Sequence, residues 1–208
     1  MRVIYCGFLK TASRSICDFC KNVLNYDVYQ GTKAKLHASD TDIIFDEFTL
    51  YDKDVESCFH KGEVENQDIY DFLDKNENMI AKEFPYFGMY KYIYSKFKDS
   101  KFILCIRDAD SLFNSYMEFM NNYRDVQCLK INRALFGINS KIDESHRQIV
   151  KDVYEKHCKD VIEYFDDKPG SLLVLDFKKL DNCESEIFNF LGIEDDGTKL
   201  KNLKDKSH

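Results

Sequence analysis

Residues 3–16 read Val3-Ile4-Tyr5-Cys6-Gly7-Phe8-Leu9-Lys10-Thr11-Ala12-Ser13-Arg14-Ser15-Ile16. An apolar run with β-branched and aromatic members is followed by Gly7, then by Lys10 among small hydroxyl residues, then by helix-like apolar spacing. This order predicts a strand, an anion-binding loop and a helix. Free backbone N–H groups and the positive end of the helix dipole would face an anion bound at that loop.

The loop also carries side chains that donate hydrogen bonds to an anion: Lys10, Thr11, Ser13, Arg14 and Ser15. It is not a Walker A loop, because that pattern places a glycine directly before the lysine and Leu9 precedes Lys10 here. Kinase and GTPase activities are therefore disfavoured. On this motif alone, a strand-to-helix turn that binds no phosphate remains the alternative.

Length and composition predict a single domain spanning residues 1–208. Hydrophobic residues make up 44% of the chain, with 17 Phe and 13 Tyr, which is enough for a substantial core. The net charge of −7 argues against a nucleic-acid partner, since such a partner requires a basic face. The sequence has neither an apolar run long enough to span a membrane nor a signal peptide, so we expect no membrane partner and a cytoplasmic location.

The cysteines and histidines form no recognisable metal pattern. Cys17 and Cys20 have redox or metal spacing, but they lie in a helical setting without a second pair nearby, so we expect buried free thiols. The histidines without ligand spacing are His37, His60, His146, His157 and His208. We therefore predict no metal site and assign the histidines no role.

Strands and helices alternate along the chain. Strands are predicted over residues 43–45, 79–81, 101–106 and 171–177. Helices are predicted over residues 13–25, 66–76, 85–98, 108–121, 143–165 and 183–191. Residues 123–142 show no strong period, which fits a lid or a connection, and the acidic residues between 40 and 56 fit solvated surface. The alternation predicts an α/β fold with a parallel sheet, whose ligands bind at the carboxyl ends of the strands.

Arg107 directly follows the apolar strand predicted over residues 101–106, so it lies at the same carboxyl edge as the loop. Ser115 comes eight residues later, about two helical turns on, and can face the same side. An arginine fork with a serine donor beside it suits a second phosphate. The alternative is a strand-end arginine that pairs with Asp108 or Asp110.

The loop at residues 10–15 and the spacing of Arg107 and Ser115 resemble the two phosphate-binding motifs of sulfotransferases that use 3′-phosphoadenosine 5′-phosphosulfate (PAPS). Residues 172–177 and 188–193 resemble the last strand and helix of a compact branch of that superfamily. The resemblance implies a P-loop NTPase-like sulfotransferase fold. It also implies metal-free transfer of a sulfuryl group from PAPS to a hydroxyl or amine, which releases adenosine 3′,5′-bisphosphate. The residues expected to bind PAPS are Lys10, Thr11, Ala12, Ser13, Arg14, Ser15, Arg107 and Ser115.

The resemblance further implies two catalytic roles. Relatives carry a base two residues before a proline, and Glu83 holds that place before Pro85. Glu83 would take the acceptor proton, with a pKa raised by burial and by nearby anions. Lys10 would stabilise the leaving phosphate. The alternative for Glu83 is a solvated acid at a strand end.

Three departures from the family pattern stand out. Ala12 replaces the usual loop glycine, Arg14 replaces a frequent threonine, and the Arg-Lys-Gly lid signature is absent from the C-terminal tail. A non-catalytic nucleotide-binding relative and a P-loop kinase-like phosphotransferase therefore remain alternatives. We expect a small-molecule or glycan acceptor in a pocket shaped by residues 30–78 and 120–145, either open or completed by another subunit of a homo-oligomer.

Overall fold

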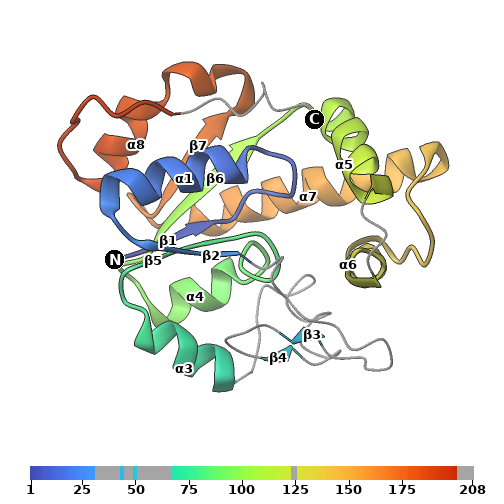
Figure 1. Ribbon diagram of the computed structural model, residues 1–208, viewed down its shortest axis with the longest axis horizontal. Helices are drawn as coiled ribbons and strands as arrows, with labels where there is room; N and C mark the ends of the chain where they lie inside the picture. The colour runs from blue at the N-terminus through green and yellow to red at the C-terminus, as the bar shows by residue number, and fades with distance from the viewer. Residues whose placement is uncertain (31–42, 45–48, 51–66, 123–125, 201–208) are drawn as a thin grey trace.

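The fold is seen in a computed structural model that describes residues 1–30, 43–44, 49–50, 67–122 and 126–200 (Figure 1). Its centre is a five-stranded sheet in the order β2 (Asp27–Gln30), β5 (Met79–Lys82), β1 (Arg2–Tyr5), β6 (Lys101–Ile106) and β7 (Leu172–Asp176). Every neighbouring pair in this sheet is parallel. β1 therefore lies in the middle of the sheet, between β5 and β6.

The inner strands are apolar except at their ends, where Arg2, Lys82 and Lys101 lie, because both faces of the sheet are covered. All residues of β1 and β5 are buried, and so is the interior of β6. Successive side chains point to opposite faces, so Ile4 and Phe102 enter one core cluster while Val3 and Ile103 enter the other. This alternation divides the hydrophobic core into two layers.

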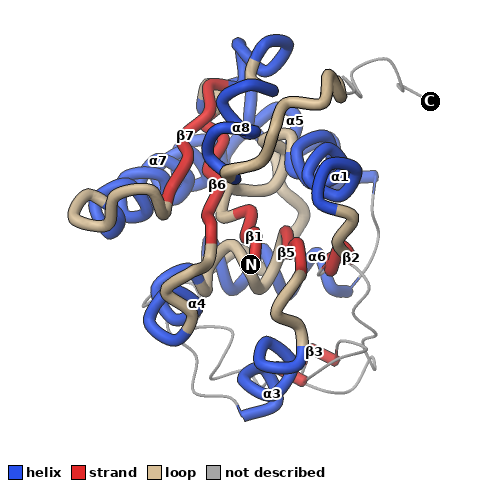
Figure 2. The backbone as a smooth tube through the Cα atoms, turned by 90° about the vertical axis from the view of Figure 1, so that its left-hand side faces the viewer, coloured by secondary structure: helices blue, strands red, loops and turns tan. Residues whose placement is uncertain are grey.

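Helices cover the sheet on both faces (Figures 1 and 2). One layer is closed by α1 (Ser13–Leu24) and α8 (Glu184–Leu191), which pack through Phe19 and Phe188 among others. The elements whose buried residues join the other layer are α3 (Gln67–Lys75), α4 (Tyr90–Lys96), α5 (Ala109–Asn122), α6 (Val126–Phe136) and α7 (Arg147–Phe165). Apart from this body, β3 (Ile43–Ile44) and β4 (Thr49–Leu50) form an antiparallel pair.

Most of the predicted elements are confirmed. The predicted helices from residues 13, 66, 108, 143 and 183 correspond to α1, α3, α5, α7 and α8, with a short 3-10 turn, η2 (Glu144–His146), before α7. The predicted strands correspond to β3, β5, β6 and β7. The acidic residues between 40 and 56, and most of the expected acceptor segment 30–78, lie outside the described residues, so their predicted roles stay predictions.

Three predictions need correction. The helix expected from Pro85 begins at Tyr90, because the preceding residues form a turn with Gly88 N donating to Pro85 O and Met89 N donating to Tyr86 O. The Phe84–Pro85 peptide in this turn is cis. Residues 123–142 contain α6, whose buried Ile131 and Leu135 pack against the core despite a weak sequence period. The edge strand β2 was missed, since its four residues are polar at both ends, show no period and follow closely after a helix.

Candidate functional site

Hydrogen bonds of the Tyr5 and Thr11 side chains hold together the loop between β1 and α1. The Tyr5 hydroxyl donates to the Thr11 carbonyl and lies 2.8 Å from Thr11 Oγ1, which donates to the Phe8 carbonyl. A side chain at Gly7 would come within 2.7 Å of the Tyr5 ring, so only glycine lets the ring fold back under the loop. The Thr11 side chain is completely buried and thus shapes the loop from inside.

The loop reaches α1 through two left-handed residues, Lys10 at φ 69° and Ala12 at φ 71°. Ala12 is the N-cap of α1 and offers no side-chain cap. The first N–H groups of the helix, from Ser13 onward, have no acceptor within the helix and so form an anion-binding end. Around this end Ser13 is buried, Ser15 is half-buried and Arg14 is exposed.

Arg107 meets this loop at the carboxyl edge of the sheet. β1 and β6 are neighbours in parallel, so the residues after both strands emerge side by side. The Arg107 guanidinium donates from Nη1 to the Lys10 carbonyl at 2.9 Å, and its Cζ lies 4.5 Å from the centre of the Phe177 ring. The two predicted phosphate-binding clusters therefore come together, and Arg107 does not form the alternative ion pair with Asp108 or Asp110.

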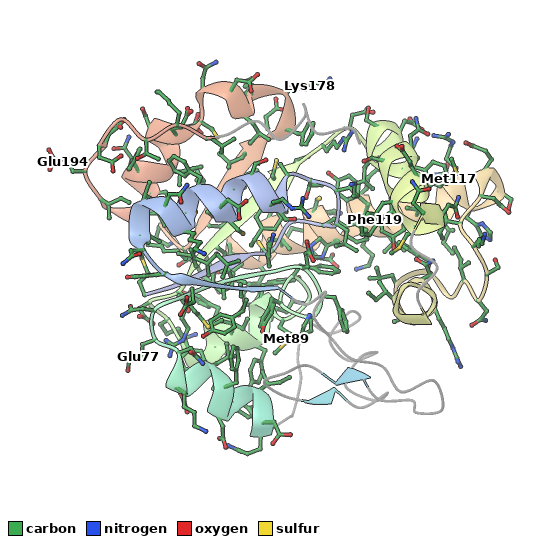
Figure 3. All side chains as sticks on the ribbon, viewed as in Figure 1. Glu77, Met89, Met117, Phe119, Lys178 and Glu194 are labelled. Atoms are coloured by element: carbon green, nitrogen blue, oxygen red, sulfur yellow. The ribbon has the colours of Figure 1, made fainter. Side chains whose placement is uncertain are left out.

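Positive charge is concentrated at Lys10. Its Nζ lies 4.9 Å from the centre of the Phe119 ring. Phe119 lies on α5 (Figure 3). Burial lowers the pKa of Lys10, and the positive charges of Arg107 and Arg14 lower it further, while Glu118 and Glu83 act in the opposite direction. An anion bound beside such a cation stabilises its charged form.

Glu83 follows β5 directly and stands on the same edge of the sheet, near enough to Lys10 to act on its pKa. The residue is left-handed, with φ 66°, and starts the turn in which Phe87 N donates to Glu83 O. Its Oε2 atom is buried from solvent. The residue as a whole is half-buried, so one carboxylate oxygen is shielded while its role as a base stays a prediction.

Ser115 lies half-buried in the second turn of α5. Within the described parts of the chain, it forms no hydrogen bond with Arg107. Arg107 and Ser115 thus lie on neighbouring elements but do not contact each other through a hydrogen bond.

Two further residues at this edge, both on α7, were assigned no role from the sequence. The Tyr154 hydroxyl accepts from Arg107 N at 2.7 Å and donates to Arg107 O at 2.8 Å. One turn along, His157 Nε2 lies 2.8 Å from the Cys6 carbonyl, and the imidazole packs against Phe8 and Phe87. Burial lowers the pKa of His157, so the ring is neutral and Nε2–H donates. The one available signal in the sequence was the three-residue spacing of Tyr154 and His157, which places both on one face of the helix.

No group of three or more His, Cys, Asp or Glu side chains is arranged to hold a metal ion within residues 1–30, 67–122 and 126–200 or the β3–β4 pair. In the same ranges, no helix is both long and apolar enough to cross a membrane. The predicted buried free thiols are confirmed for Cys17 and Cys20.

A parallel sheet covered by helices, with a cationic loop after its central strand and an arginine after the next strand, defines an α/β protein whose candidate ligand site lies at the carboxyl edge. The sulfotransferase domain family model matches residues 2–194, and the chain belongs to this family. Membership supports sulfotransferase activity in general.

Solved structures give the same fold. A crystal structure of a sulfotransferase from Alicyclobacillus acidocaldarius is similar with a TM-score of 0.55 and 14% sequence identity, over 96% of this chain and 83% of that one. No curated protein sequence matches the chain significantly. The predicted sulfotransferase-like α/β fold is therefore confirmed.

We expect Ala12→Gly to stabilise the protein, because a left-handed conformation costs alanine about 1 kcal/mol that glycine does not incur. Equilibrium urea unfolding should show a gain of roughly 0.5 kcal/mol, since the more flexible unfolded glycine chain offsets part of the benefit. The same substitution at Ala134, inside α6, should instead destabilise by about 1 kcal/mol. A loss of stability in Ala12→Gly would contradict the strained loop.

The free energy of unfolding should fall as the pH drops below about 6.5. His157 is protonated at a higher pH in the unfolded chain than in the folded protein, where burial lowers its pKa. The slope from this residue is at most about 1.4 kcal/mol per pH unit. His157→Gln keeps an N–H donor for Cys6 O and removes the titration, so its stability should change less between pH 6.5 and pH 5. Equal slopes in urea unfolding of the two proteins would show that His157 is not held neutral.

Proposed function

We propose that this protein transfers a sulfuryl group from PAPS to an acceptor hydroxyl or amine. The observation that carries the proposal is the 2.9 Å bond from Arg107 Nη1 to Lys10 O, which places two cationic clusters at one sheet edge. PAPS carries charged groups at both its 5′ and 3′ positions, and two adjacent anion sites suit such a nucleotide. Family membership supports the same reaction class.

In the proposed complex, the loop N–H groups with Lys10, Arg14, Ser13 and Ser15 bind the 5′-phosphosulfate. Thr11 and Ala12 contribute through the backbone, because the Thr11 hydroxyl is already bonded to Phe8 O. Arg107 and Ser115 bind the 3′-phosphate across the edge.

The proposed transfer is an in-line displacement at sulfur. The acceptor oxygen or nitrogen forms a bond to sulfur while the bond from sulfur to the bridging phosphate oxygen breaks, leaving adenosine 3′,5′-bisphosphate. Glu83 takes the acceptor proton. Lys10 donates to the bridging oxygen as negative charge develops there, in a site where burial strengthens electrostatic interactions. The acceptor is a small molecule or a glycan.

Calorimetry with adenosine 3′,5′-bisphosphate and adenosine 5′-monophosphate tests the nucleotide. We expect the bisphosphate to bind at least about tenfold more tightly, because a charged hydrogen bond to Arg107 contributes about 1.5–3 kcal/mol. Equal affinities would contradict the proposal. Tight binding of magnesium ATP without any effect of a 3′-phosphate would instead favour the kinase-like alternative.

Replacing the proposed base tests the chemistry. Transfer of labelled sulfate from PAPS to a panel of phenols, sugars and amines should fall about a hundredfold or more in Glu83→Gln, since general base catalysis contributes 10²–10⁴-fold. Bisphosphate affinity should change less than about twofold, because the charge lost is not a nucleotide contact.

Glu118→Gln is the matched control, because Glu118 also acts on the pKa of Lys10 but is exposed on α5. It should retain turnover. Wild-type protein that binds the bisphosphate and transfers sulfate to no acceptor would favour the non-catalytic alternative.

A further inference from the structure

Arg107 is held by contacts from three separate elements. Its Nη1 donates to Lys10 O in the loop after β1, its backbone bonds to Tyr154 on α7, and its Cζ lies over the Phe177 ring. Phe177 is the first residue of η3 (Phe177–Asn182), directly after β7. Both the backbone and the side chain of Arg107 are thus held in position.

The Tyr154 hydroxyl replaces strand partners at the point where β6 ends. The β6–β7 register runs to Ile106 and Asp176, so Arg107 is the first residue beyond the ladder. Tyr154 accepts from its N–H at 2.7 Å and donates to its carbonyl at 2.8 Å. The tyrosine side chain is 2% exposed, which leaves its hydroxyl little freedom to move. One hydroxyl therefore fixes both backbone groups of Arg107 and with them the direction of its side chain.

Phe177 restrains the position of the guanidinium. The ring centre lies 4.5 Å from Arg107 Cζ, which is within the range of a cation–π contact. The ring offers no hydrogen-bond acceptor oxygen, so this contact uses none of the N–H donors in a conventional hydrogen bond. A guanidinium has five N–H donors, and the Arg107 side chain spends one on Lys10 O among its contacts in the described structure. The remaining donors form a fork of fixed orientation beside the loop.

We infer that Tyr154 and Phe177 are positioning residues that orient Arg107 and thereby set the preference for a nucleotide with a 3′-phosphate. This inference rests on the proposed function and deepens it. Neither side chain needs to touch the nucleotide, because each acts through Arg107. The geometry of a bidentate arginine–phosphate contact is exacting, so a small rotation of the fork weakens it.

The test compares the affinities of adenosine 3′,5′-bisphosphate and adenosine 5′-monophosphate by calorimetry in single variants. Tyr154→Phe keeps the ring and removes the hydroxyl, and it should weaken bisphosphate binding about fivefold to tenfold. Phe177→Leu removes the π face and should weaken it about twofold to fivefold. The affinity for the monophosphate should change less than about twofold in both variants. The ratio of bisphosphate to monophosphate affinity should therefore decrease. A purely structural defect would lower both affinities together.

Tyr164→Phe is the matched control, because Tyr164 is on the same helix and donates to a backbone carbonyl, Lys91 O, away from the loop. It should keep the wild-type preference. Thermal unfolding of each variant confirms that it is folded, and the half-buried Phe177 provides the test if Tyr154→Phe does not fold.

An unchanged preference in folded Tyr154→Phe and Phe177→Leu would overturn this inference and leave the proposed function standing. Wild-type protein without any preference for the bisphosphate would overturn the proposed function, and this inference with it.

Discussion

The parallel pairing of β1 with β6 is the constraint on which the site depends. It brings the residues after both strands to one edge, where the Arg107 guanidinium bonds to the Lys10 carbonyl. Because that acceptor is a backbone atom, the contact neutralises none of the positive charge of Lys10 or Arg107. Burial lowers the pKa of both side chains, and the charge of Arg107 lowers that of Lys10 further, while nearby carboxylates offset part of the effect. An anion bound at this edge, as the proposed function requires, would stabilise the charged forms of both side chains.

Helix α7 links this edge to the hydrophobic core. Tyr154 and His157 lie one turn apart, and they bond to the residues that follow β6 and β1 respectively. The Phe8 ring packs between them, at 5.7 Å from the Tyr154 ring and 5.9 Å from the His157 ring. The separation of the two strand ends is therefore fixed by a rigid element as well as by the sheet. Functional sites on such elements keep their geometry better than sites built from loops alone.

The sequence was most informative where local chemistry decides the structure. The apolar run before Gly7, the strand before Arg107 and the helical spacing from Ser13 each follow from short-range patterns, and all three are confirmed. Long-range contacts could not be predicted, since nothing near Tyr154 in the sequence indicates its hydrogen bond with Arg107, 47 residues away. The turn at residues 85–88 differs from the predicted helix because buried aromatic residues have the same composition in both. The strand β2 was not predicted because its four residues, polar at both ends, are too few to show a period.

Tyr5 and Thr11 fill the interior of the loop after β1, and this order affects how the loop would bind a nucleotide. Under the proposed function, a loop that is already ordered before the nucleotide arrives loses little conformational entropy on binding, so more of the interaction energy appears as affinity. Association should also need no slow rearrangement of this segment, which leaves the encounter itself to set the rate of capture. Gly7 makes this preorganisation available, because any larger residue there would displace the ring on which the loop rests.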